Sequence, residues 1–175
     1  MRTDTKKSLP ALRKPKDTEL FTNELTDTQS IKLLKEAVKA RKQAQYPNVP
    51  EYAITIPKYE DATANGLTKC IIDFLNSRDY CQAERINNQG VMRTNKYGQQ
   101  FMATSSMTNG TADISATIYG RSVKIEVKIG NDKQSQNQIE YQNQIENAKG
   151  YYVIAKDFKG FLDWFNLKKG GQNGR

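Results

Sequence analysis

Acidic and basic side chains are spaced along one predicted β-hairpin so that they could act together. Asp113 lies in a first strand (112–118), and Glu126 and Lys128 lie in a second strand (122–129). Both strands alternate apolar and polar side chains, which predicts one apolar and one polar face. In the register that aligns the two apolar faces, the carboxylates face each other with Cβ atoms about 5 Å apart, and the lysine shares their face. Carboxylates this close repel each other unless positive charge lies between them, so the pattern suits a divalent cation.

The residue types that are missing restrict the chemistry that this hairpin could perform. The chain has no His, and its two Cys, Cys70 and Cys81, do not stand at a zinc-ligand spacing. Nucleophilic catalysis through Ser-His-Asp or Cys-His groups and imidazole metal sites are therefore excluded. A metal would have to be held by oxygen, which points to Mg²⁺ or Mn²⁺. Cys70 lies on the apolar face of a predicted helix, so we expect a small core residue there.

The charge distribution favours a polyanionic partner. Of the net charge of +8, residues 1–50 contribute +5, from 11 basic and 6 acidic side chains, and residues 51–175 contribute +3. Lysine and arginine release condensed counterions when they bind phosphates, which suits DNA. No run approaches the roughly 20 apolar residues that span a bilayer, and the N-terminus lacks an apolar signal segment. We therefore expect a cytoplasmic protein with no membrane association.

The first 50 residues divide into a basic, Pro-containing arm (1–25) and a predicted amphipathic helix. Thr26 and Gln29 could form a capping box at the helix start, and the Pro residues that follow Tyr46 end it. The apolar stripe of this helix consists of Ile31, Leu34 and Val38. Two interpretations are open: a helix docked on the body of the protein, or a basic arm that binds nucleic acid or a partner.

From residue 51 the pattern predicts a body of alternating helices and strands. The predicted helices cover 63–77, 135–148 and the segment that Asp157 caps, and the predicted strands cover 80–87, about 101–103, 112–118, 122–129 and 151–155. Tyr119-Gly120 is the two-residue turn of the hairpin, and Gly150 ends the second helix. The last helix directs Phe158, Phe161, Leu162 and Phe165 inward. Leaving out the short segment at 101–103, this order is α-β-β-β-α-β with a further helix. It predicts an α/β fold with a mixed β-sheet flanked by helices and a flexible tail at 168–175.

Four motifs follow one another in the second half of the chain. They are Gly110-Thr111-Ala112-Asp113, Ile125-Glu126-Val127-Lys128, Ser135-Gln136-Asn137-Gln138 and Gly150-Tyr151-Tyr152-Val153-Ile154. In this order they resemble the VRR-NUC branch of the PD-(D/E)XK nuclease superfamily, which combines a GxxD turn, an E-V-K strand and an S-x-x-Q helix start. The resemblance covers about residues 60–166 and includes the upstream segments 65–72 and 83–88. It implies a restriction-endonuclease-like core in residues 51–167, with residues 1–50 outside it.

The resemblance implies a role for each residue of the cluster. Asp113 and Glu126 would bind one Mg²⁺ or Mn²⁺, with the carbonyl of Val127 as a third ligand. Lys128 would stabilise charge on the phosphorus or position the attacking hydroxide. Gln138 would orient the water or the lysine, and it also fits a capping box at the start of its helix. These roles imply an endonuclease that hydrolyses DNA phosphodiester bonds, with branched DNA among its candidate substrates.

Further residues are candidates for contacts with DNA. They are Arg85 on the first strand, Asn65 at the start of the first body helix, and Gly110, which gives a flexible approach to the acidic residue. Asn65 stands where many members of the branch carry Glu, so a second metal would be held less firmly. Tyr141, one turn beyond Gln138, is interpreted as a core residue. The expected partner is DNA, and a homodimer stays open.

Three alternatives to a nuclease remain. The cluster could be a salt bridge on a solvated sheet face with no role in catalysis. The chain could be a catalytically silent nucleic-acid-binding module that retains the nuclease fold. It could also be a structural or packaging protein of a phage, in which the N-terminal helix is the working part. The combination of Asp113, Glu126 and Lys128 on one face favours the nuclease, and small members of this branch are often carried by phages and mobile elements.

Overall fold

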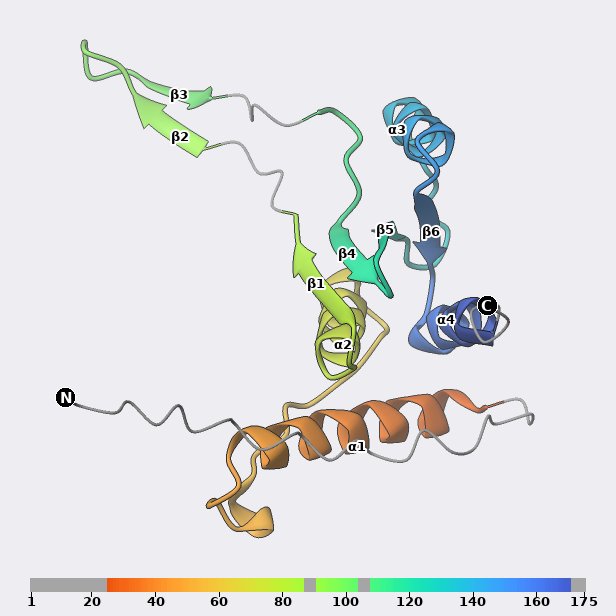
Figure 1. Ribbon diagram of the computed structural model, residues 1–175. Coiled ribbons are helices and arrows are strands. Elements are labelled where there is room, and N and C mark those ends of the chain that lie inside the picture. Colours follow the sequence, from red (N-terminus) through yellow and green to blue (C-terminus); the bar gives the residue numbers. More distant parts are fainter. Residues whose placement is uncertain (1–24, 87–90, 104–107, 171–175) are drawn as a thin grey trace, which may run out of the picture.

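The computed structural model of the chain describes residues 25–86, 91–103 and 108–170. Its centre is a four-stranded sheet with the strand order β1-β4-β5-β6 (Figure 1). These strands are β1 (Cys81–Arg85), β4 (Ile114–Ile118), β5 (Arg121–Val127) and β6 (Tyr151–Ala155). The β1–β4 and β4–β5 pairs are antiparallel, whereas the β5–β6 pair is parallel. The predicted α/β class and mixed sheet are therefore confirmed.

The register of the β4–β5 hairpin agrees with the alternation of its side chains. Ile114 pairs with Ile125 and Ile118 pairs with Arg121, as the alignment of the two apolar faces predicts. The turn residues Tyr119 and Gly120 both have positive φ angles, 49° and 78°. A type I′ turn requires positive φ at both central positions, and its twist matches that of the strands it joins. The predicted turn and pairing are confirmed.

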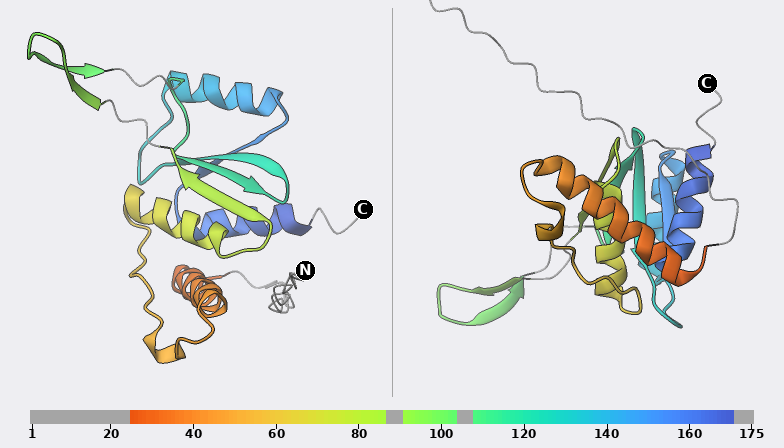
Figure 2. Two further views of the ribbon diagram at one scale, coloured as in Figure 1. Left: turned by 60° about the vertical axis from the view of Figure 1, so that its left-hand side comes forward. Right: turned by 90° about the horizontal axis from the view of Figure 1, so that it is seen from below.

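Helices cover the two faces of the sheet unequally (Figure 2). The apolar face lies on α2 (Ala64–Asn76) and α4 (Phe158–Gly170), and α1 (Asp27–Gln45) packs across these two helices as an outer layer. On the other face, α3 (Gln136–Asn147) makes the parallel connection from β5 to β6. A short 3₁₀-helix spans Glu51–Ala53. No helix among the described residues is both long and apolar enough to cross a membrane.

The hydrophobic core lies between the apolar sheet face and α2 and α4. Phe74 of α2 is at its centre and meets the rings of Phe158, Phe161 and Phe165 edge-on, at centroid distances of 5.2–6.4 Å. These three aromatic residues and Leu162 are buried, as the spacing in the last helix predicts. Cys70 is also buried in this core, and neither cysteine forms a disulfide.

The interpretation of α1 as a docked helix is the one that agrees with the structure. Thr26 and Gln29 form the predicted capping box, and Leu34 and Val38 belong to the same buried cluster as the core of the body. Three cations on this helix also contact the body: Lys39 pairs with Glu51 at 2.7 Å, Lys42 donates to the Thr55 carbonyl at 2.8 Å, and Arg41 lies 4.0 Å from Asp79. The predicted arm at residues 1–25 lies, apart from its last residue, outside the described part of the chain.

A separate two-stranded hairpin, formed by β2 (Val91–Thr94) and β3 (Gln100–Ala103), stands away from the main sheet (Figure 1). The strand expected near residues 101–103 is present, whereas β2 was not predicted. Its tip is fixed by Asn95, whose side-chain oxygen accepts hydrogen bonds from the amides of Tyr97 and Gln99. The hairpin is inserted between β1 and β4 along the chain, after Arg85 and before Asp113.

The ends of α3 and α4 can be compared with those expected. α3 ends at Asn147, close to the expected end at residue 148, and the residue with a left-handed backbone beyond it is Lys149 (φ 64°) and not Gly150. Gly150 matters for a different reason, because a Cβ there would lie 2.9 Å from the Ile145 side chain. α4 needs a correction, because it continues through Gly170 and so includes residues 168–170 of the predicted tail; residues 171–175 lie outside the described part of the chain. At the other end of α4, the predicted cap is confirmed, since Asp157 accepts from the Gly160 amide at 2.6 Å.

Candidate active site

Three segments bring the candidate residues together at one end of the sheet. Asp113 directly precedes β4, Glu126 lies near the end of β5, and Lys128 follows that strand. Gln138 lies in the first turn of α3, which starts close to the same end. The structure therefore gathers the three residues of the predicted cluster and the predicted helix-start glutamine.

Glu126 is the buried centre of the site. One of its oxygens, Oε1, lies 3.1 Å from Lys128 Nζ and also accepts a hydrogen bond from Gln138 Nε2. The other oxygen, Oε2, accepts from the Tyr152 hydroxyl at 3.4 Å. Burial and the nearby charge of Asp113 raise the pKa of Glu126 above its ordinary value, although the ammonium of Lys128 opposes this shift. The carboxylate thus carries unfavourable charge in the folded state.

Lys128 is buried beside two carboxylates. Its ammonium lies 3.1 Å from Glu126 and 3.3 Å from Asp132, which is exposed. Burial alone would lower the pKa of this lysine, but hydrogen bonds and charges from Glu126 and Asp132 outweigh burial and raise the pKa above its ordinary value. These contacts favour the charged form of Lys128 inside the site.

Asp113 is held in place through the backbone of the opposite strand. Its Oδ2 accepts a hydrogen bond from the Val127 amide at 2.9 Å, and its carbonyl accepts from the Ile86 amide at 2.8 Å. No donor among the described residues reaches the other carboxylate oxygen, Oδ1, so this oxygen is open to a ligand. The side chain of Val127 is buried in the core cluster, so any contribution of this residue to a ligand must come from its backbone.

Gln138 performs both of the tasks that the sequence suggests for it. Its side-chain oxygen accepts from the Ser135 amide at 2.9 Å, and the Ser135 hydroxyl accepts from the Gln138 amide at 3.4 Å, which completes a capping box. Its amide nitrogen donates to Glu126. The start of α3 is thereby connected directly to the buried carboxylate, and the helix fixes the orientation of that side chain.

The residues predicted to contact DNA lie on two sides of the cluster. Arg85 donates to the side-chain oxygen of Asn65 at 2.9 Å on an exposed surface, so β1 and the start of α2 present these two residues together. Packing explains why residue 110 is a glycine. Its φ is 77°, and a Cβ at this position would lie 2.3 Å from the backbone of Asn137 in α3. The contact of Gly110 with DNA stays a prediction.

Two residues of the site were not predicted. Tyr152 reaches Glu126 from β6, and burial together with Glu126 raises the pKa of this tyrosine. Asp132 reaches Lys128 from the loop after β5. The contact of Lys128 with Asp132 depends on the turn between them, and the position of Tyr152 depends on the parallel pairing of two distant strands, so no local pattern predicted either. Tyr141, interpreted as a core residue, is half-buried and meets the Tyr152 ring edge-on at 6.3 Å.

The donor set of the site fits a hard, oxygen-binding cation. No group of three or more His, Cys, Asp or Glu residues that could hold a metal occurs in the described ranges. Two carboxylates are nevertheless sufficient for Mg²⁺, which retains several waters and is commonly bound through one or two carboxylates and substrate phosphates. The open oxygen of Asp113 and the remaining lone pairs of Glu126 could supply these contacts. The all-oxygen set disfavours Zn²⁺.

Comparison with known proteins identifies no relative that would assign this site. No protein-family model matches the chain, and no curated protein matches it either. The function of the cluster is therefore inferred from its own residues and their geometry.

Proposed function

We propose that the chain is a metal-dependent DNA endonuclease with a restriction-endonuclease-like core. The observation that carries the proposal is the meeting of Asp113, Glu126 and Lys128 at one end of the sheet, with Glu126 and Lys128 buried. Burying charges opposes folding unless they are well paired, so a buried acidic cluster calls for a functional explanation. The order α2, β1, β4, β5, α3 and β6 also agrees with the α-β-β-β-α-β order expected for such a core.

Each residue can be given a task in phosphodiester hydrolysis. A bound Mg²⁺ or Mn²⁺ would polarise a phosphoryl oxygen and lower the pKa of a water ligand. Asp113 would hold the ion through its open oxygen, and Glu126 through lone pairs that its neighbours leave available. Lys128 is charged and buried, so it would stabilise the negative charge that develops on the phosphoryl oxygens. Gln138 would keep Glu126 in one orientation.

Exposed polar residues on β1, on α2 and on the separate β2–β3 hairpin support DNA as the substrate. Arg85 and Asn65 form an adjacent pair that could contact a phosphate. The tip of the β2–β3 hairpin exposes Tyr97, with the ammonium of Lys96 5.0 Å from its ring centroid. Residues 85–112, which join β1 to β4 through this hairpin, contain basic but no acidic side chains. A two-stranded ribbon of this kind fits the major groove of DNA.

One observation favours a second candidate, a silent nucleic-acid-binding module. The oxygens of Glu126 already have partners in Lys128, Gln138 and Tyr152, so the cluster is satisfied as an ion pair without any ligand. Such a cluster could stabilise a fold that binds DNA but does not cut it. The phage structural alternative, with α1 as the working part, is less well supported, because the apolar stripe of α1 is buried against the body.

A nicking assay separates the two candidates. The full chain is incubated with supercoiled plasmid and with synthetic four-way junctions, in Mg²⁺, Mn²⁺ or EDTA. We expect cleavage with either metal and none in EDTA, and loss of cleavage in Glu126→Gln. The matched control is Glu84→Gln, which removes an exposed carboxylate from β1 of the same sheet. DNA binding without metal-dependent cleavage would support the silent module and contradict the nuclease.

A further inference from the structure

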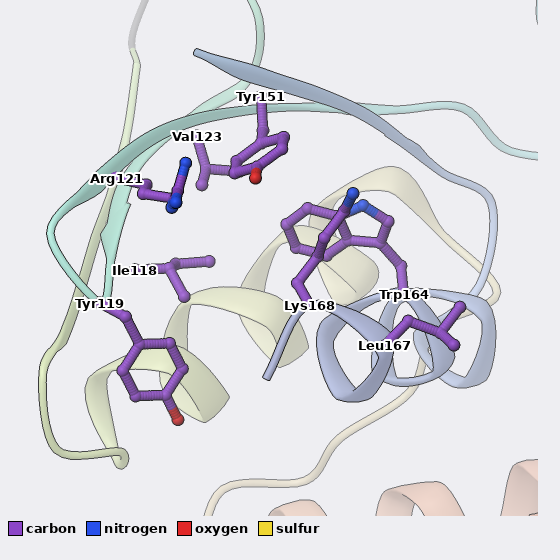
Figure 3. A pocket seen from close by; sticks show the side chains of 8 residues that line it. All are labelled: Ile118, Tyr119, Arg121, Val123, Tyr151, Trp164, Leu167 and Lys168. Carbon is purple, nitrogen blue, oxygen red and sulfur yellow. The ribbon is translucent and has the colours of Figure 1, made fainter. Parts of the chain in front are cut away.

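A cavity of about 250 Å³ opens at the end of β5 that is remote from the carboxylates (Figure 3). Arg121 begins β5 and lines this cavity, whereas Glu126 lies five residues further along the strand. At about 3.3 Å per residue, the two positions are roughly 17 Å apart. Successive side chains of a strand point to opposite faces, so Arg121 and Glu126 also differ in face. A ligand in this cavity would not touch the candidate active site.

Two cations point into the cavity from opposite sides. The guanidinium of Arg121 lies 5.7 Å from the ring centroid of Tyr151, and the ammonium of Lys168, on α4, lies 4.7 Å from the same centroid (Figure 3). No acidic residue lines the cavity. Within the described residues, neither cation forms an ion pair with a carboxylate. The positive charge is therefore available to an anionic ligand.

The walls between the cations are aromatic and aliphatic. The half-buried rings of Tyr151 and Trp164 meet at a centroid distance of 6.4 Å and an interplanar angle of 76°. Ile118 and Val123 line the cavity from β4 and β5 and are buried. The ligand that matches these walls combines a negative group with a planar, weakly polar ring.

We propose that this cavity binds one nucleotide of a single-stranded nucleic acid, with the phosphate between Arg121 and Lys168 and the base against Trp164. Cationic side chains for the backbone and aromatic side chains for the bases are the combination that binds single strands without sequence preference. The volume lies just below the range of about 300–1,000 Å³ that is typical of small-molecule pockets, which suits a single nucleotide and not a duplex. The proposal does not depend on cleavage at the carboxylate cluster.

Tryptophan fluorescence gives a direct test, because Trp164 is the only tryptophan in the chain. The full chain is titrated in EDTA with thymidine 5′-monophosphate, thymidine, inorganic phosphate and octanoate. We expect saturable quenching by the monophosphate and at least roughly tenfold weaker binding of thymidine, because thymidine lacks the charge-assisted contacts. Equal affinity for thymidine and its monophosphate, or tighter binding of octanoate, would overturn the proposal.

Variants locate the binding. Arg121→Gln and Lys168→Gln should each weaken binding of the monophosphate roughly two- to fivefold, as expected for the loss of one exposed ionic contact. Lys133→Gln, a matched exposed lysine outside the cavity, should leave the affinity unchanged. Glu126→Gln should also bind normally, so a failed nuclease proposal and a failed nucleotide site give different results. Undiminished affinity in both cavity variants, with circular dichroism showing intact folds, would place the ligand elsewhere.

Discussion

At the C-terminal end of β5, side chains on both faces of the sheet are hidden from solvent, but by different means. On one face Val123, Ile125 and Val127 are 0–5% exposed and pack in the core beneath α2 and α4. On the other, Glu126 and Lys128 are 2% and 7% exposed and are held by hydrogen bonds and ionic contacts. Hydrophobic burial accounts for the first face, because removing apolar surface from water stabilises the fold. Burial of charged groups opposes folding unless they are well paired, and a function in catalysis would explain why these two are retained.

The largest expected effect is the loss of DNA cleavage when a residue of the polar face is replaced. Asp113→Asn, Glu126→Gln and Lys128→Ala should each reduce DNA cleavage by at least about a hundredfold, because each removes a group that acts on the transition state. The measurement is the rate of plasmid nicking in Mg²⁺ at saturating enzyme. Glu84→Gln serves as the control for loss of a carboxylate.

Unchanged cleavage in all three variants, with circular dichroism spectra that match that of the wild type, would contradict a catalytic role of the polar face. In that case the polar face would be a structural ion pair, and any nuclease activity would belong to other residues. Loss of activity in Glu84→Gln as well would show that the effect is general and not specific to the cluster.

Adjacent substitutions on the two faces should change stability in opposite directions. Ile125→Ala leaves a cavity in the core and should lower the free energy of unfolding by about 2–5 kcal/mol. Glu126→Gln should instead raise the melting temperature at neutral pH. The pKa of Glu126 is raised by burial and by Asp113, so the folded state binds its proton more tightly than the unfolded state does, and the ionised form lowers stability.

The sign of this effect gives a pH test. The stability advantage of Glu126→Gln over the wild type should be greatest above the raised pKa and should shrink as the pH falls through that pKa. Lys128 keeps Asp132 as a partner in the variant, so its ammonium is not left unpaired. Thermal melts of both proteins across acidic to neutral pH measure the difference. A variant that is less stable than the wild type at neutral pH would show that the Glu126–Lys128 pair is net stabilising.

A metal ion bound at the polar face should stabilise the folded protein. Mg²⁺ or Mn²⁺ should raise the melting temperature of the wild type, because a ligand that binds the folded state at about one hundred times its Kd adds about 2.7 kcal/mol. The shift should disappear in Asp113→Asn, which weakens the open oxygen ligand, and should persist in Glu84→Gln. An equal shift in Asp113→Asn would place the ion at another site.

The sequence-based predictions succeeded where the paired strands are adjacent along the chain. The register of β4 and β5 could be predicted because a shift by one residue would place Ile114 against a lysine, and the Tyr119-Gly120 turn fixes the same register. The position of Asp113, Glu126 and Lys128 on one face of the sheet follows from that register. Gln138 could be predicted from its capping-box spacing together with the family resemblance.

Other features depend on contacts that no local pattern carries. Tyr152 reaches the site only because β6 pairs in parallel with β5 across the α3 connection, and that register involves residues about thirty positions apart. β2 was missed because the segment around it is rich in Asn, Gln and Gly and shows no clear alternation. The docking of α1 depends on the packing of Leu34 and Val38 against α2 and α4. The sequence could not predict it, because an apolar stripe suits docking on the body and binding to a partner equally well.

A comparison within the capping box measures how strongly α3 supports the polar face. Ser135→Ala removes one cap hydrogen bond and should cost about 1 kcal/mol of stability. Gln138→Ala removes the reciprocal cap bond and also the contact with Glu126. We expect similar losses of stability, but a reduction in kcat only for Gln138→Ala. Equal kcat values in the two variants would show that Gln138 acts solely as a cap.

The smallest expected effect distinguishes the hairpin tip from the outer helix in binding DNA. Each phosphate neutralised on duplex DNA contributes roughly 0.9 to the slope of log affinity against log salt concentration. Lys96→Gln removes an exposed cation from the β2–β3 tip and should flatten that slope by about this amount. Lys39→Gln removes a cation of α1 that already pairs with Glu51 at 2.7 Å, so the slope should stay unchanged. Fluorescence anisotropy of labelled duplex in EDTA at several salt concentrations measures both slopes without cleavage. A flattened slope for Lys39→Gln and an unchanged one for Lys96→Gln would reverse the assignment and make α1 the DNA-binding surface.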